Sequence, residues 1–394
     1  MAASGVGFPA FFNDRANISF LVRTGATLEE ARGYAIGGCV VPMVPGAVAP
    51  VQPITFHMAK CLELTLFSGF DPRTGIQVGP ATGKFEEFKT FEEVMIAFKK
   101  QVEYFSREAA EVITLQRLLR EQMICPMFND LLTDDCIKRG MSSLGDGARF
   151  RFNYHNGRTM IDVADSLAAL KKRVFEEGSI SRDELIEALR TNFEGKGEAR
   201  KLLMSAPKYG NDDDDVDSIA AGLYQWWQQM ASQLNSAYGD KYMACAYSVG
   251  GHVPAGERTG ALPNGRLAGR PLSDGAVSPS QGADTKGPTA VINSCCKIDQ
   301  SKILGTLLNM KFLASTLKTK DDRKKLFFLI KTYFDGGGKH IQFNTVDRAT
   351  LLDAQERPEL HRNLMVRVAG YSAYFVELSR GMQDEIVART EHSL

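Results

Sequence analysis

The sequence predicts an α/β fold, because several segments have helical periodicity and one has the alternation of a β-strand. Apolar residues recur at intervals of three and four over residues 57–70 and 90–123. Helical patterns return over residues 162–176 and over 180–192, where a serine precedes the second helix as a good N-cap. An alternating strand is expected within residues 336–347, after a run of glycines.

The remaining segments complete this prediction. Residues 218–239 and 301–334 are also expected to be helical. A shorter helix is expected to begin after Thr27, which has a glutamate three residues later as in a capping box, and to end at Gly37. Residues 242–299 are rich in Gly, Pro and Ser and predict one long loop. A loop of that length inside a compact domain is usually functional or part of an assembly.

Composition excludes several classes of function. The chain has 394 residues, with 47 Lys and Arg against 47 Asp and Glu, so it carries no net charge to attract nucleic acid or an anionic membrane. Its seven cysteines are irregularly spaced without a CxxC pair, which predicts a reducing, cytoplasmic location and no zinc or iron–sulfur site. The longest apolar stretch, 39–56, contains four prolines and predicts a buried loop instead of a membrane helix. The acidic run 211–217 and the six histidines lack metal-binding spacing.

The strongest chemical signal is RVAGYSAYFVELSRGMQDEIVARTEHSL, residues 367–394. This segment resembles the glycyl-radical signature, in which Arg-Val-x-Gly-Tyr precedes a helix that contains Gln and Ile and is followed by Arg-Thr. A radical at an α-carbon is delocalised into the flanking amides only if the centre can flatten, and a side chain would oppose flattening. The residues that match the signature are Arg367, Val368, Gly370, Tyr371, Gln383, Ile386, Arg389 and Thr390.

A second motif, GGCVVPM at residues 37–43, resembles the cysteine loop of the same family. In such a loop the cysteine passes a hydrogen atom to the glycyl radical and becomes a thiyl radical, which then abstracts hydrogen from the substrate. The resemblance implies that Gly370 stores the radical and that Cys39 is the catalytic thiol. The adjacent pair at 295–296 lacks this context and is expected to be inert.

The chain is therefore identified as similar to glycyl radical enzymes of the pyruvate formate-lyase and glycerol dehydratase type. The resemblance implies the C-terminal half of a ten-stranded α/β barrel, with the Cys loop and the Gly loop meeting inside it. Residues 1–260 are expected to belong to the barrel and residues 261–394 to a glycyl-radical domain. Further stretches that resemble the family are 74–94, 162–177, 259–291 and 336–359.

The resemblance also implies a function. We expect an anaerobic lyase that cleaves a C–C, C–O or C–heteroatom bond of a small organic substrate. A separate activating enzyme, which uses S-adenosylmethionine and an iron–sulfur cluster, would install the radical, so no bound cofactor or metal is expected here. Arg367, Val368 and Tyr371 are expected to support the radical loop, and His252 and His340 are candidates for lining the cavity.

The sequence departs from the family at Val41. In the eliminating and decarboxylating branches a glutamate usually stands two residues after the cysteine and moves a proton, which valine cannot do. The pyruvate formate-lyase branch has a double cysteine, where this chain has Gly38 before Cys39. The branch that adds hydrocarbons to fumarate stays open as an alternative, although no arginine lies between Cys39 and Arg73 to bind a carboxylate.

The length is the second departure. Family members have a large N-terminal half, whereas this chain begins 38 residues before Cys39. We therefore expect a fragment, a truncated gene model or one subunit of a split enzyme, with an N-terminal half-barrel or a second copy as partner. Alone, it is expected to aggregate. Two further interpretations stay open, a spare-part protein that replaces a damaged C-terminus and an inactive fragment.

Overall fold

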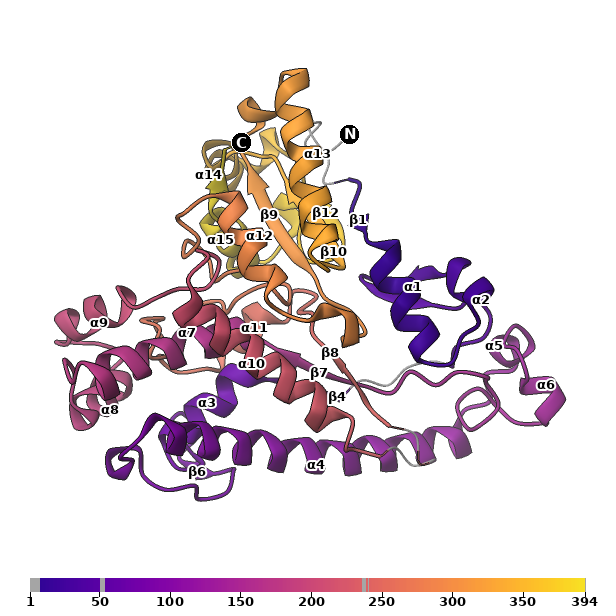
Figure 1. Cartoon of the computed structure of the whole chain (residues 1–394), viewed down its shortest axis with the longest axis horizontal. Helices are drawn as coiled ribbons and strands as arrows, with labels where there is room; N and C mark the ends of the chain where they lie inside the picture. The colour runs from indigo at the N-terminus through magenta and orange to yellow at the C-terminus, as the bar shows by residue number, and fades with distance from the viewer. Residues whose placement is uncertain (1–7, 50–53, 236–238, 240, 394) are drawn as a thin grey trace.

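The computed structural model describes residues 8–49, 54–235, 239 and 241–393. Its strands form separate small sheets, and within the described residues they do not close into a barrel. The C-terminal sheet with helices α12 to α15 stands above the rest of the chain in Figure 1, while the long helix α4 runs along the base. The fold is thus α/β, as predicted.

The first parallel sheet has the order β4–β7–β8 and is formed by β4 (Ile54–His57), β7 (Tyr154–Arg158) and β8 (Met243–Cys245). Its outward face packs on helices, because Trp227 is fully buried against Phe56 at 5.5 Å and against His155 at 4.3 Å between ring centroids. The other edge of β4 pairs with no strand in the described part of the chain. The residues of β4 also form one wall of a cavity.

The second sheet has the order β1–β10–β9–β13, in which β9 and β10 are parallel and every residue of both is buried. Burial on both faces is typical of a parallel strand covered by helices. Its strands are β1 (Phe11–Phe12), β9 (Leu308–Phe312), β10 (His340–Asn344) and β13 (Glu391–His392).

Backbone hydrogen bonds join the two sheets. The Ala246 amide donates to the Gly305 carbonyl at 3.0 Å, and the Leu304 amide donates to the Ala244 carbonyl at 2.8 Å. Residues that follow β8 therefore lie directly beside the segment that leads into β9. This junction fixes the face of the first sheet relative to the C-terminal segment that carries Gly370.

Most predicted helices are confirmed. Thr90 and Ser181 accept the hydrogen bonds expected of N-caps, from the Glu93 and Glu184 amides respectively. The helices predicted over 57–70, 90–123, 162–176, 180–192 and 218–239 are α3 (Met58–Leu66), α4 (Phe91–Met123), α7 (Met160–Leu170) with a π-helical end (Lys171–Glu176), α8 (Arg182–Arg190) and α10 (Asp214–Ala231).

Two predictions were wrong in type. Residues 301–334 are not one helix, because they contain β9 before α13 (Lys320–Asp335); a short, fully buried strand and a buried helix have the same apolar pattern. Residues 242–299 are not one loop, because they contain β8, α11 (His252–Glu257) and α12 (Pro288–Cys296).

The helix after Thr27 is shorter than predicted. The capping box between Thr27 and Glu30 is present, but α2 (Leu28–Arg32) ends before Gly33. The next residues form a hairpin of β2 (Ala35–Gly37) and β3 (Val41–Met43). Cys39 therefore lies in the turn of a hairpin, and the prediction that it follows a helix end was wrong.

The remaining elements complete the cover around these sheets. Among the described residues, none of the helices combines the length and apolar character that crossing a membrane requires. These elements are α1 (Asp14–Arg23), β5 (Phe70–Asp71), β6 (Ile76–Gln77), α5 (Met127–Leu131), α6 (Cys136–Arg139), α9 (Gly197–Met204), α14 (Arg348–Glu356), β11 (Met365–Arg367), β12 (Ser372–Tyr374) and α15 (Arg380–Ala388).

Candidate functional site

The structure brings the two predicted loops into contact. Cys39 lies in the β2–β3 turn after Gly38, and Gly370 lies in the turn between β11 and β12 with a φ of +89°. A methyl group placed on Gly370 would lie 2.8 Å from Cys39 Sγ and closer still to Cys39 Cβ. Only glycine fits here, because the space and the left-handed φ both exclude a side chain. The separation suits direct transfer of a hydrogen atom between the two residues.

Side chains of β10 hold the Gly loop from one side. The Gly370 amide donates to Gln342 Oε1 at 3.3 Å, and Arg367 Nε donates to the same oxygen at 2.6 Å. Asn344 Nδ2 donates to the Arg367 carbonyl at 2.6 Å and its Oδ1 accepts from the Arg367 amide at 2.7 Å. The radical loop is thereby fastened to a buried strand of the second sheet.

A buried charge network holds the loop from the other side. Arg389 donates to the carbonyls of Arg367 at 3.2 Å and Val368 at 2.9 Å, and it pairs with Glu385 at 2.8 Å and Asp274 at 3.2 Å. Burial opposes ionisation of Glu385, but the charge of Arg389 outweighs it and lowers the pKa of Glu385 well below its usual range. Burial raises the pKa of Asp274. One guanidinium therefore fixes two consecutive carbonyls of the loop.

The environment of Cys39 favours the thiol over the thiolate. Its side chain is half-buried and packs against the cluster of Val40, Leu307 and Ala369. Burial raises the pKa of the Cys39 thiol, and the nearby charge of Arg367 opposes the shift without cancelling it. A nucleophilic cysteine needs the opposite shift, toward thiolate. Hydrogen-atom transfer needs the S–H bond, which this environment preserves.

The three residues expected to support the loop surround Gly370. Arg367 is buried and bonded as described, and Val368 is fully buried, with its amide donating to the Tyr371 carbonyl at 2.9 Å. Tyr371 is 37% exposed, and its hydroxyl lies 3.5 Å from the position a Cβ of Gly250 would occupy. Burial raises the pKa of the Tyr371 phenol, so the group stays protonated at neutral pH.

The two histidines named as candidates for lining the cavity are both buried. His252 Nδ1 lies 3.1 Å from Ser248 Oγ and its Nε2 lies 3.5 Å from Glu385, which places it in the network behind the Gly loop. His340 packs edge-on against Phe12 at 4.8 Å between ring centroids, and burial lowers its pKa to about 3. Both side chains belong to the packing around the site.

The structure agrees with the departure from the family at Val41, where the usual glutamate is missing. Its side chain is 4% exposed and packs in the apolar cluster with Phe20 and Leu304. Position 41 therefore offers no group that can move a proton. Within the described residues no group of three or more His, Cys, Asp or Glu side chains is arranged to hold a metal ion.

A set of polar residues on one face of β7 was not predicted from the sequence. Tyr154, Asn156 and Arg158 share this face because side chains alternate along a strand. The hydroxyls of Tyr154 and Tyr247 lie 2.7 Å apart, and Asn156 Oδ1 accepts from the Tyr247 amide at 3.0 Å. Tyr247 packs against the same apolar cluster as Cys39. Only the β4–β7–β8 pairing brings this face near the Cys loop, and no short motif marked it.

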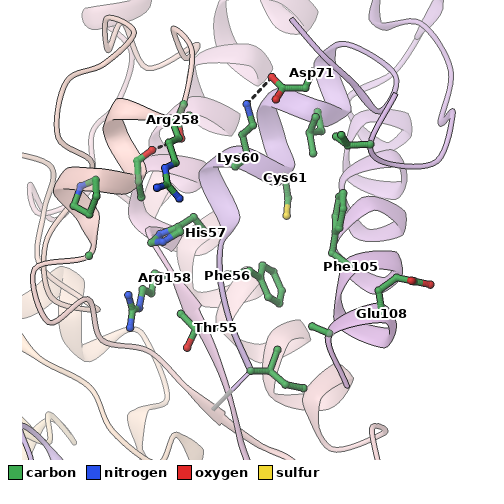
Figure 2. A pocket seen from close by; sticks show the side chains of 18 of the residues that line it. Thr55, Phe56, His57, Lys60, Cys61, Asp71, Phe105, Glu108, Arg158 and Arg258 are labelled. Atoms are coloured by element: carbon green, nitrogen blue, oxygen red, sulfur yellow. Dashed lines mark hydrogen bonds and ion pairs between the residues drawn. The ribbon is translucent and has the colours of Figure 1, made fainter. Parts of the chain in front are cut away.

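A cavity of about 1200 Å³ opens beside this face (Figure 2). His57, Arg158 and Arg258 lie on one side of the β4 ribbon, while Phe56 and Phe105 lie on the other. The cavity thus has a cationic side at the end of β7, where Arg158 lies, and an apolar side next to α4. Arg158 was not predicted from the sequence. Only arginines between Cys39 and Arg73 were considered there as ligands for a carboxylate, and Arg158 lies far beyond that segment.

Comparisons with known proteins agree with these motifs. A family model described as pyruvate formate lyase-like matches residues 1–256, and one described as glycine radical matches residues 273–376. The chain is 39% identical to trans-4-hydroxy-L-proline dehydratase of Clostridioides difficile, over all of this chain and 50% of that protein. It is 36% identical to isethionate sulfite-lyase of Desulfovibrio desulfuricans, over 99% of this chain and 48% of that protein.

Solved structures show the same relation. The glycerol-bound B12-independent glycerol dehydratase of Clostridium butyricum superposes with a TM-score of 0.95 at 40% identity, over all of this chain and 50% of that one. The chain thus spans about half the length of the relatives it matches. The division near residue 260 stays a prediction.

The contact between the two loops makes a prediction about stability. Gly370→Ala should lower the free energy of unfolding by about 2 kcal/mol, from the strained φ and the clash with Cys39. In a Cys39→Gly background the clash is largely removed, so the same substitution should cost about 1 kcal/mol less. Urea unfolding of the four proteins measures this coupling.

Gly287→Ala is the matched control for that cycle. Gly287 has the same φ of +89° but has open space where a Cβ would lie. Its substitution should cost the same in both backgrounds. Equal costs for Gly370→Ala with and without the Cys39 side chain would contradict the contact.

Proposed function

Because the chain belongs to the pyruvate formate lyase-like family of glycyl radical enzymes, we propose that it is the radical-bearing part of a lyase in which Gly370 stores the radical and Cys39 acts on the substrate. The observation that carries this proposal is the contact between the two residues, with Cys39 Sγ 2.8 Å from the position of a Gly370 Cβ. The Cys39 thiol, which burial keeps protonated, therefore lies directly beside a glycine α-carbon that no side chain shields.

The proposed reaction is a closed cycle of hydrogen transfers. The Gly370 radical takes hydrogen from the Cys39 thiol, which becomes a thiyl radical while the glycine regains its second α-hydrogen. The thiyl then takes hydrogen from a substrate carbon, and the substrate radical breaks an adjacent bond. The product radical takes hydrogen back from the Cys39 thiol, and the thiyl recovers hydrogen from Gly370. No net oxidant or reductant is consumed.

The relatives support bond cleavage over radical addition to fumarate. Their names are those of dehydratases and a sulfite-lyase, all of which break a bond of a small substrate. Because Val41 cannot move a proton, any proton the leaving group needs must come from elsewhere. The Tyr154–Tyr247 pair is suited to hydrogen-bond a departing oxygen, since burial raises the pKa of Tyr154 to about 12 and keeps the phenol protonated.

Activation requires a second protein. We propose a radical S-adenosylmethionine enzyme with an iron–sulfur cluster, acting in an anaerobic cytoplasm. Gly370 is half-buried, and the hydrogen bonds of its loop to Gln342 and Arg389 would break if the activating enzyme drew the loop out of the site. The chain itself needs no bound cofactor for this cycle.

A half-barrel partner is the second part of the proposal. The free edge of β4 and the cavity beside it leave one side of the site open. An apolar strip continues from the cavity along α4, with Met123 80% and Phe128 77% exposed. A polypeptide equivalent to the half of the relatives that this chain does not match would cover both the β4 edge and the apolar strip. We therefore propose this polypeptide as the partner, in preference to a second copy of the chain. The strip consists of Val112, Leu115, Leu119 and Met123 on α4 and Met127, Phe128 and Leu131 on α5.

Electron paramagnetic resonance tests the radical assignment. After anaerobic activation by a radical S-adenosylmethionine enzyme, wild-type protein should show a doublet, because one α-hydrogen remains on the radical carbon. Gly370→Ala should abolish the doublet. Cys39→Ala should keep it but lose product formation from a panel containing trans-4-hydroxy-L-proline, isethionate and glycerol, measured with the partner half present. Cys296→Ala, which removes another half-buried thiol, should keep both. Turnover that survives Cys39→Ala would refute the proposal.

Light scattering tests the partner surface. The wild-type chain alone should self-associate through the apolar strip. The double variant Leu115→Lys with Met123→Lys should be a monomer. The same variant should no longer co-purify with the co-expressed complementary half of trans-4-hydroxy-L-proline dehydratase. Phe327→Lys removes an equally exposed apolar side chain on α13 and should change neither property. A wild-type chain that is monomeric and ignores the complementary half would rule this surface out.

A further inference from the structure

Arg158 is a cation without a counter-ion in the described part of the chain. It ends β7 and lines the cavity, and its Nε is buried without a hydrogen-bond partner. The groups that interact with it electrostatically are Tyr247, Cys245 and Tyr154, none of which is charged at neutral pH. Burial lowers the pKa of Arg158 without removing its charge at any ordinary pH. Burying an unpaired guanidinium costs stability, so such a residue is normally paired.

The neighbouring groups do not neutralise this charge, because one is an uncharged histidine and the other a second arginine. His57, on the same side of the β4 ribbon, has a buried Nδ1 without a partner, and burial together with Arg158 lowers its pKa to about 4. Arg258 lies at the same side of the cavity. Among the carboxylates of the lining, Asp71 is paired with Lys60 at 2.8 Å, and Glu108 points away on the α4 side. The cationic side of the cavity is therefore built to receive an anion.

The position of Arg158 links this charge to the radical pair. Its guanidinium packs against Gly251, and the adjacent Gly250 contacts the Tyr371 hydroxyl beside Gly370. Tyr154 shares the β7 face with Arg158, and its hydroxyl lies 2.7 Å from that of Tyr247, which packs with Cys39 against the cluster of Val40, Leu307 and Ala369. An anion bound at Arg158 would thus lie at one end of the β7 face whose other end approaches Cys39.

Resting on the proposed function, we propose that Arg158 binds the carboxylate of a small organic acid and so selects an anionic substrate for the radical reaction. The planar fork of a guanidinium matches a carboxylate with two parallel hydrogen bonds, whereas a hydroxyl can accept only one. Arg158 is a residue that determines specificity. The partner half would cover the apolar side of the cavity.

The test uses one matched pair of probes, (S)-lactate and (S)-propane-1,2-diol. The two have the same skeleton, but the diol has a hydroxymethyl group where lactate has a carboxylate. Calorimetric titration of the unactivated chain should show that lactate binds at least about tenfold more tightly than the diol. Arg158→Gln should abolish the difference, and Arg158→Lys should keep part of it because the charge remains without the fork. Arg73→Gln should leave it unchanged, since Arg73 lies on the exposed rim and bonds the Glu257 carbonyl.

Stability gives an independent readout. Removing an unpaired buried charge should raise the urea midpoint of Arg158→Gln above that of wild type, whereas loss of a structural contact would lower it. A lowered midpoint, or equal binding of both probes by the wild-type chain, would overturn the proposal. So would lactate binding that vanishes when the titration is repeated on the two-part assembly, because Arg158 would then pair with a carboxylate of the partner. These titrations need no radical, so their failure is separate from failure of the lyase assignment.

Discussion

The site depends on the approach of two backbone turns that sequence places at opposite ends of the chain. A radical can pass between Cys39 and Gly370 only if nothing separates the sulfur from the α-carbon, and the absence of a Cβ on Gly370 provides that gap. The β2–β3 hairpin presents the thiol, and the β11–β12 turn presents the glycine. The glycine turn must therefore be held through its backbone and its neighbours, because Gly370 has no side chain to anchor it.

That support comes from buried polar groups. Gln342 binds the Gly370 amide, and Arg389 binds the carbonyls that precede it, while Glu385 and Asp274 neutralise the arginine. A network of this kind is costly if any member is missing, because each buried group would lose its partner. Arg158 contrasts with this network, since its charge has no partner among the described residues.

The sequence was enough to predict the two loops that the structure brings into contact and most of the helices, because these depend on local signals. The glycine motif at Gly370, the cysteine loop at Cys39 and the capping box at Thr27 each occupy a few neighbouring residues. The sequence did not predict β9, because a short strand buried on both faces has no alternation to distinguish it from a helix. Gln342 and Arg158 were not predicted either, because their importance arises only when strand pairing brings them beside the loops.

The central claim is that the Cys39 thiol exchanges hydrogen directly with Gly370. The measurement that tests it is the paramagnetic resonance spectrum of the activated chain transferred anaerobically into D₂O, where the thiol becomes S–D. Repeated exchange through Cys39 should replace the remaining α-hydrogen of the radical by deuterium, whose weaker coupling collapses the doublet. In Cys39→Ala the doublet should persist in D₂O. A wild-type doublet that persists, or a collapse that occurs without the Cys39 thiol, would contradict the account.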